Sequence, residues 1–418
     1  MSLEQLVRVW RAFNPPTLEK RDDALKFGIL GAANSAGMTL TIPAKLHPEV
    51  KIQAVAARDR KRAEEFAKKN GIPNVRDSYQ EILDDPNIDC ILVPLPNALH
   101  FEWAVRAIRA GKHVLLEKPS VSNSAEAEFL FSMPELDAPN APVLLEAFHY
   151  RFHPIWSVFM SEIRSADVVH VDTYSMIPWW FVTRDHIHFN YNLAGGTMMG
   201  MGTYNFAALR LIFGTEPEEC LTADVKHFTE GVHHDCDYEF KTKFRFPGGG
   251  IGEAFSTLQG PTFWHPSYAT VTHRQVEVHD KTLPSSHQKL VTREVTIHGF
   301  IHAVFWHRVD VNEHFEIRDR DTGKVVKKWT ESRWKKAHTA KDAGVSGELA
   351  NIESETYWMS FRYQLEAFVN RVKGRETAYW VDREDSLLQM RMVDMAYEKS
   401  GLGLRPTSNY LAKVKESC

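Results

Sequence analysis

Short continuous apolar runs alternate with amphipathic stretches over the first third of the chain. Lys26–Leu30 and Ile52–Ala57 are two such runs, and Arg60–Asn70 follows the second one with helical spacing up to Gly71. Continuous apolar strands between helices are typical of a parallel sheet covered on both faces. The pattern continues through three further strands and one helix before it ends near residue 151, with elements expected at Cys90–Val93, Phe101–Ala110, Val114–Leu116 and Val143–Leu145.

The pattern changes in the second half. Phe240, Thr242, Phe244 and Phe246 alternate with charged residues, and His314–Lys328 is expected to form a hairpin around residues 321–323. Such alternation predicts an antiparallel sheet with one wetter face. The polar stretch Thr330–Glu348 is expected to be a loop or an insertion. Two helices should close the chain, the second capped by Asp382 and ended by Gly401.

These patterns divide the chain into three parts. Residues 1–23 form an N-terminal extension, residues 24–150 a Rossmann-type parallel domain, and residues 151–418 an α/β domain with a large, mostly antiparallel sheet. In the extension, Leu3, Leu6, Val7 and Trp10 have helical spacing, so a helix packed on the body is expected. A transit peptide is the alternative, but Glu4 and the lack of serine argue against it.

Charge and composition exclude several classes of partner. The net charge is -4, which provides no electrostatic attraction for nucleic acid or an anionic membrane. No apolar run approaches the ~20 residues of a membrane helix. The four cysteines form no CxxC pair, and histidine pairs such as His149/His153 and His186/His188 lack a metal-binding pattern. A cytoplasmic protein without a metal is therefore expected, with structural or surface roles for the histidines.

The turn after the first strand can bind a dinucleotide. Residues 31–36 read G-x-G-x-x-A, with Gly31 at the bend, Ala33 in place of the middle glycine, and Ala36 at the end. In such turns the pyrophosphate rests on the N-terminus of the following helix. A tight strand-to-helix turn without a ligand is the alternative. The position between a strand and a helix favours binding.

The end of the second strand bears on the choice of cofactor. Arg58 lies where NAD enzymes carry an acidic residue, and an arginine there suits the additional phosphate of NADP. Arg62 is one helical turn further on and could contact the same phosphate. Asp59 would favour NAD if its side chain faced the ribose. NADP is therefore expected, with NAD possible.

The stretch from residue 90 to residue 119 carries a more specific set of motifs. It contains a strand, a Pro-Asn-x-x-His turn, a helix, Ala-Gly-Lys-His-Val and Glu-Lys-Pro. With the turn at Gly31, this stretch closely resembles the glucose-fructose oxidoreductase/inositol dehydrogenase family. The resemblance implies a second domain whose open sheet builds homodimers or homotetramers. It implies a cofactor site that includes Pro96, Asn97, His100, Glu117 and Lys118, with Lys118 beside the nicotinamide and a cis bond before Pro119.

A second match lies at residues 194–214. Gly196 and Gly202 align with the family's glycines, and Tyr204 takes the acid/base position. Tyrosine there is similar to the subgroup of dimeric dihydrodiol dehydrogenase and NADP-linked D-xylose dehydrogenase. Gly200 stands where the family has an aspartate. Tyr204 is expected to open a helix, so a nearby ammonium from Lys118 and the helix N-terminus should both lower its pKa.

The expected activity is hydride transfer from a carbohydrate-like alcohol to NADP. The resemblance favours an aldose of the D-xylose type, oxidised to its lactone. A trans-dihydrodiol or cyclitol dehydrogenase and a non-catalytic NADP-binding regulator of the same fold are the alternatives. Arg151, Trp179 and Trp180 are candidate substrate contacts, because aromatic rings stack on sugars, although the tryptophans would equally suit a core or an interface.

Overall fold

The computed structural model describes residues 2–344 and 353–416. Six parallel strands form the first sheet in the order β3-β2-β1-β4-β5-β6. The strand order reverses between β1 and β4, which is where ligands bind in open α/β sheets. The strands are β1 (Leu25–Leu30), β2 (Val50–Ala56), β3 (Asn74–Arg76), β4 (Cys90–Val93), β5 (His113–Leu116) and β6 (Leu144–Glu146).

Helices connect these strands. All four residues of β4 are buried, as expected for a strand covered on both faces. A π-helical turn, Gly37–Thr41, precedes the short α2, so the helix after the dinucleotide turn is irregular. The helices are α2 (Ile42–Lys45), α3 (Arg60–Asn70), α4 (Tyr79–Asp84), α5 (His100–Arg109) and α6 (Ser124–Phe131). The parallel half of the predicted fold is confirmed, with β3 and α4 in addition.

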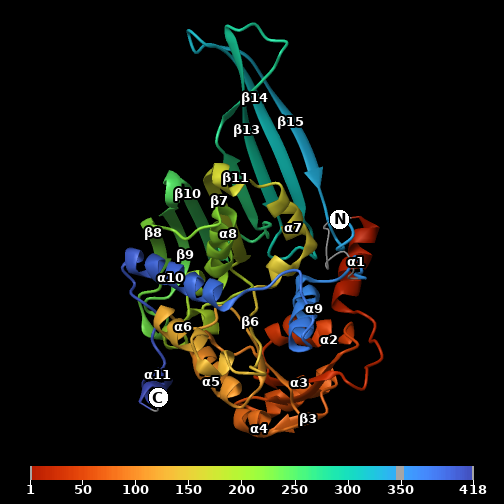
Figure 1. Ribbon diagram of the computed structural model, residues 1–418. Helices are drawn as coiled ribbons and strands as arrows, with labels where there is room; N and C mark the ends of the chain where they lie inside the picture. The colour runs from red at the N-terminus through yellow and green to blue at the C-terminus, as the bar shows by residue number, and fades with distance from the viewer. Residues whose placement is uncertain (1, 345–352, 417–418) are drawn as a thin grey trace.

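The second sheet is large and mostly antiparallel. Its order is β15-β14-β13-β11-β7-β10-β9-β8, with β12 paired to β13, and β10 runs parallel to β7. Helices α7 (Pro154–Ser161) and α8 (Thr203–Phe213) lie in front of it in Figure 1. The strands are β7 (Val168–Pro178), β8 (Glu219–His227), β9 (Asp237–Arg245), β10 (Ile251–Gly260), β11 (Tyr268–His273), β12 (Val276–Val278), β13 (His287–His298), β14 (Arg308–Asp319) and β15 (Val325–Lys335).

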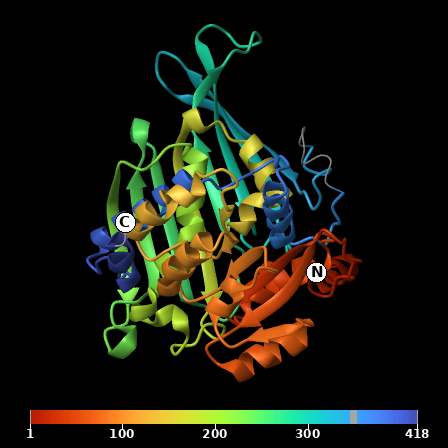
Figure 2. The same cartoon turned by 60° about the horizontal axis from the view of Figure 1, so that its bottom comes forward.

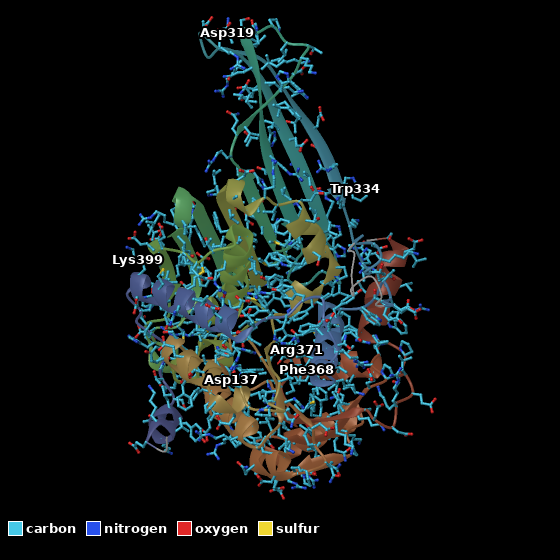
Figure 3. The ribbon with its side chains drawn as sticks, viewed as in Figure 1. Asp137, Asp319, Trp334, Phe368, Arg371 and Lys399 are labelled. Carbon is cyan, nitrogen blue, oxygen red and sulfur yellow. The ribbon has the colours of Figure 1, made fainter. Side chains whose placement is uncertain are left out.

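One end of this sheet projects beyond the body. The strands β13, β14 and β15 extend outward, and Asp319 lies near their tip (Figure 3). The expected loop at Thr330–Glu348 is wrong at its start, because β15 pairs with β14 as far as Lys335. Most of β15 is exposed, so it has no buried face that would produce an alternating pattern. Residues 345–348 of the expected loop lie outside the described residues.

The last three helices return to the first sheet. They are α9 (Ser360–Val372), α10 (Arg383–Ser400) and α11 (Asn409–Lys415), and the last of them was not predicted. Phe368 of α9, labelled in Figure 3, packs on Phe27 of β1 with ring centroids 5.9 Å apart. In Figure 2 the two sheets lie side by side, with α9 close to their junction. The predicted cap and stop of α10 are confirmed, since Asp382 accepts from the Asp385 amide and Gly401 is left-handed.

The N-terminal extension forms the predicted helix, α1 (Leu3–Phe13), and packs on the body. Its contact face differs from the expected one. Gln5 donates to the Phe305 carbonyl at 3.0 Å, and Phe13 stacks on Phe305, whereas Leu3 and Trp10 are 77% and 63% exposed. None of the helices in residues 2–344 and 353–416 is long and apolar enough to cross a membrane.

Candidate active site

The dinucleotide turn leaves β1 at the point where the strand order reverses. Gly31 has φ 115°, and its amide donates to the Ala56 carbonyl at 2.7 Å. A Cβ at this residue would lie 3.0 Å from the Leu95 side chain. Ala33 is half-buried and Ala36 is buried. The turn is therefore built on a backbone conformation that favours glycine.

The charged residues after β2 point in different directions. The Asp59 carboxylate caps α3, where it accepts from the Arg62 amide at 3.3 Å. Arg60 forms an ion pair with Glu64 at 3.0 Å. Arg58 and Arg62 are exposed. Asp59 is thus engaged by the helix, and two arginines remain at the surface beside the cofactor turn.

The loops after β4 and β5 are tied to one another. The ring nitrogens of His100 lie 2.7 Å from the Pro119 carbonyl oxygen and 2.8 Å from that of Leu95. Asn97 donates to the Ala194 carbonyl at 2.9 Å, and neighbouring Pro96 is half-buried. The bond between Lys118 and Pro119 is cis, as the family resemblance implied. These contacts join the first sheet to the loop before α8.

Two half-buried charged residues, Glu117 and Lys118, directly follow β5. The Glu117 carboxylate accepts from the Thr39 hydroxyl, and burial raises the pKa of Glu117. The next residue, Lys118, donates from Nζ to the Gly200 carbonyl at 2.7 Å. Burial lowers the pKa of Lys118 to about 8. Gly200, which replaces the family's aspartate, therefore serves Lys118 through its backbone oxygen.

A π-helical segment, Met198–Gly202, brings that carbonyl into place and continues directly into α8. Its first amide, that of Met198, donates to the Asp237 carboxylate at 2.7 Å, and the Tyr397 hydroxyl donates to the same group at 2.9 Å. Asp237 belongs to none of the sequence motifs. Because the segment precedes α8, Tyr204 does not open a helix, and the expected help from a helix N-terminus is wrong.

Tyr204 lies beside Lys118. The Lys118 nitrogen is 4.5 Å from the centroid of the Tyr204 ring, and the Tyr204 hydroxyl oxygen is 3.0 Å from His149 Nε2. The expected lowering of the tyrosine pKa is not observed. Burial, with smaller contributions from Glu117 and Tyr150, raises the pKa of Tyr204 well above its ordinary value. The ammonium sits over the ring face and is bonded to Gly200, which leaves the desolvation of the phenol dominant.

Three histidines surround this pair, and sequence reasoning assigned none of them to the site. Burial lowers the pKa of His149 well below its ordinary value, that of His188 to about 3 and that of His302 to about 4. The charge of Lys118 contributes to all three shifts. The histidines are therefore neutral at pH 7. The sequence offered one signal that could have assigned His149 to the site: it lies three residues after Glu146, at the end of strand β6. Among the described residues no cluster of His, Cys, Asp or Glu could hold a metal.

The candidate substrate residues lie in two different environments. The Arg151 side chain is fully buried, forms an ion pair with Asp385, and lies 4.5 Å over the Phe148 ring. This placement argues for a structural role. Trp179 and Trp180 are 55% and 52% exposed on the loop after β7, and the Trp180 indole donates to the Thr262 carbonyl at 2.9 Å. His188 ends the same loop beside Lys118.

Comparisons with known proteins agree with this geometry. Residues 25–135 match the oxidoreductase family described as having an NAD-binding Rossmann fold. The chain is 30% identical over 387 residues to D-xylose 1-dehydrogenase (NADP(+)) 2 of Haloferax volcanii, a match that covers 91% of this chain and 98% of the relative. The chain belongs to this family, that of glucose-fructose oxidoreductase and inositol dehydrogenase. It is an oxidoreductase with a Rossmann domain.

Two further similarities bear on this family. A trans-1,2-dihydrobenzene-1,2-diol dehydrogenase of Mus musculus is 29% identical over 230 residues, or 55% of this chain and 67% of the relative. The fold of a 3-ketoreductase from Actinomadura kijaniata, solved with NADP and TDP-benzene, is similar over 90% of this chain and 98% of that one. Its TM-score is 0.64 and its sequence identity 22%. At this identity the solved structure supports the fold only.

A glycine beside the π-helical segment offers a test of its anchoring. Gly196 has φ 133°, and a Cβ there would meet the Asp237 carboxylate and lie 2.5 Å from the Tyr397 hydroxyl oxygen. Gly196→Ala should therefore lower the free energy of unfolding by about 2–4 kcal/mol and reduce any activity that depends on Tyr204. Denaturant unfolding measures the loss. Gly37→Ala is the matched control, since a Cβ at Gly37 meets no atom within 4 Å. Equal stability of the two variants would contradict the anchoring.

Proposed function

We propose that this protein is an NADP-dependent dehydrogenase that oxidises a carbohydrate-like alcohol, with an aldose of the D-xylose type converted to its lactone. The observation that carries the proposal is the Lys118–Tyr204 pair. The ammonium lies 4.5 Å over the phenol ring at the end of β5, next to the cofactor turn. The relative from Haloferax volcanii carries the corresponding activity in its name, which supports an aldose as substrate.

The residues of the site divide the chemistry between them. NADP bound at the turn after β1 would supply the acceptor for the hydride of the alcohol carbon. Tyr204 takes the hydroxyl proton, and Lys118, with a pKa of about 8, keeps most of its positive charge at pH 7 and stabilises the developing oxyanion. Tyr204 is buried and Lys118 half-buried, so little water screens the interaction between them.

The cofactor site follows from the turn and the arginines. Gly31, Ala33 and Ala36 would carry the pyrophosphate, and the exposed Arg58 and Arg62 the additional phosphate of NADP. Asp59, which would favour NAD, is engaged as the cap of α3. Pro96, Asn97, His100 and Glu117 would shape the wall against which the nicotinamide lies.

The substrate would enter from the side of the loop after β7. Trp179 and Trp180 are exposed enough to stack on a sugar ring, and their loop leads to His188 beside Lys118.

A homodimer or homotetramer would form through the face of the second sheet opposite α8. Tyr174 on that face is stacked between Phe255 and Tyr268, with centroids 5.5 Å and 5.1 Å away. A cytoplasmic location suits the buried free thiols of Cys90, Cys220 and Cys236.

Tyr204→Phe tests the reaction. The variant keeps the ring and removes the oxygen that takes the proton, so turnover with D-xylose and NADP should fall by about 10²–10⁴ with cofactor binding little changed. NADPH absorbance measures the rate across a panel of aldoses, polyols and diols. Tyr410→Phe is the matched control, because Tyr410 lies on α11 and packs on Phe101 of α5 rather than on Tyr204 or Lys118.

The same panel separates the alternatives. Preference for diols or cyclitols would make the protein a dihydrodiol or cyclitol dehydrogenase of the same class. Tight NADP binding with no oxidation of any member would support the regulator. Full activity of the Tyr204→Phe variant would remove Tyr204 from the chemistry.

Arg58→Ala tests the choice of cofactor. A charge-assisted bond to phosphate contributes about 1.5–3 kcal/mol, so its loss should weaken NADP binding roughly ten- to a hundredfold and leave NAD almost unaffected. Fluorescence titration with both cofactors measures this. Arg60→Ala is the control, because Arg60 is paired with Glu64. Equal losses for NADP and NAD would mean that Arg58 does not recognise the phosphate.

Tyr174→Arg tests the assembly. A charge at the centre of the stacked aromatic row should shift the native mass toward the monomer, because it cannot be buried against a second sheet at low cost. Light scattering measures the mass. Trp334→Arg is the control, because it also replaces an aromatic residue by arginine but lies on the exposed strand β15 (Figure 3). Dissociation by Trp334→Arg alone would place the interface on the projecting strands.

A further inference from the structure

Tyr204 needs a group that can receive its own proton. Its pKa is raised well above 10, so it is protonated at neutral pH and cannot act as a base by itself. Lys118, the nearest cation described, already donates to the Gly200 carbonyl and lies over the ring instead of at the hydroxyl. The group at the hydroxyl is His149, whose Nε2 is 3.0 Å from the Tyr204 oxygen.

His149 is held in one orientation by α9. Its Nδ1 lies 2.8 Å from the Ser360 hydroxyl oxygen, and its ring packs on Phe361 with centroids 4.0 Å apart and planes at 30°. A neutral imidazole carries one proton. If that proton is on Nδ1 and donated to Ser360, Nε2 is free to accept from Tyr204. Ser360, the first residue of α9, is buried and 211 positions away in the chain.

Burial and two neighbouring groups keep His149 neutral, so one of its ring nitrogens carries no proton. Burial is the largest cause of its lowered pKa, and His302 and Lys118 contribute. Each of these comes from a different element: the loop before β14, and the end of β5. None of them is a carboxylate that would hold a proton on the imidazole permanently.

We propose that Ser360, His149 and Tyr204 form a proton relay, in which His149 receives the phenol proton while Tyr204 receives the proton of the substrate hydroxyl. The inference rests on the proposed dehydrogenase function and extends it. His149 and Ser360 act through Tyr204, so both are positioning residues and Tyr204 remains the group that touches the substrate.

The step balances with NADP as the oxidant. The alcohol carbon loses a hydride to the nicotinamide, and the alcohol oxygen loses its proton to Tyr204 Oη. The Tyr204 proton passes to His149 Nε2, which gives an imidazolium whose Nδ1–H still donates to Ser360. The O–H bond of the substrate breaks and an N–H bond forms. After product release the imidazolium loses the proton to water, which its lowered pKa favours.

The first experiment reads the tautomer without activity. Nitrogen-15 NMR of the imidazoles at pH 7 should show His149, identified by its absence in His149→Gln, with the proton on Nδ1. Ser360→Ala should shift or mix this tautomer. A proton on Nε2 in the wild type would make Tyr204 the acceptor and overturn the relay. This result does not depend on which substrate, if any, is oxidised.

The second experiment is the pH profile of D-xylose oxidation. The wild type should have a flat rate around neutral pH, with loss only well below pH 6.5 where His149 becomes protonated. His149→Gln keeps a hydrogen bond to Tyr204 but cannot take a proton. Its rate at pH 7 should fall by about a hundredfold or more, and should then rise about tenfold per pH unit up to about pH 8, because Tyr204 must ionise directly; above that pH Lys118 loses the charge that supports the reaction.

The controls separate a relay from a structural role. His314→Gln removes an exposed histidine that also contacts a hydroxyl, that of Thr330 at 3.0 Å, and should leave rate and profile unchanged. A His149→Gln variant with a lower rate but a wild-type flat profile would show that His149 only packs, and would overturn the relay. A wild type that binds NADP but oxidises nothing would contradict the proposed function, while the NMR result would still decide the relay.

Discussion

The half-buried ammonium of Lys118 is the point at which the two halves of the molecule meet. Removing a charge from water is costly unless polar groups replace the lost hydration. Here the replacements come from the second half of the chain: the Gly200 carbonyl at 2.7 Å and the face of the Tyr204 ring. The nearby carboxyl groups of Glu117 and Glu146 favour the charged form. The lysine thus aligns the end of β5 with the start of α8.

That alignment depends on an irregular backbone. A regular helix through Met198–Gly202 would place the Gly200 carbonyl and the Tyr204 ring differently relative to Lys118, because a π-helical turn changes the phase of every later residue. Asp237 holds the first turn of the segment, and the left-handed Gly196 leaves room for its carboxylate. At position 200 it is therefore the backbone oxygen that contacts Lys118, a contact that needs no side chain.

The surroundings of the pair favour neutral groups. His149, His188 and His302 all have lowered pKa values, partly because they share their space with Lys118. A single retained positive charge among neutral rings suits a reaction in which negative charge develops on an oxygen atom. It also leaves Tyr204 protonated, which makes a neutral acceptor at its hydroxyl chemically useful.

Local sequence signals were enough for five of the six parallel strands, the left-handed turn at Gly31 and the cap of α10 by Asp382, because each depends on residues within a few positions of one another. The family motifs further singled out Lys118 and Tyr204. The hairpin predicted at residues 314–328 covers only the start of β15. The rest of this strand, to Lys335, has exposed residues that carry no alternation, and the contact face of α1 was not predicted either. The roles of Gly200, Asp237, His149 and Ser360 were decided by tertiary structure alone. Their partners lie 39 to 211 positions away in the chain. A pKa shift depends on which groups are buried next to one another, and those neighbours are set only when the chain has folded.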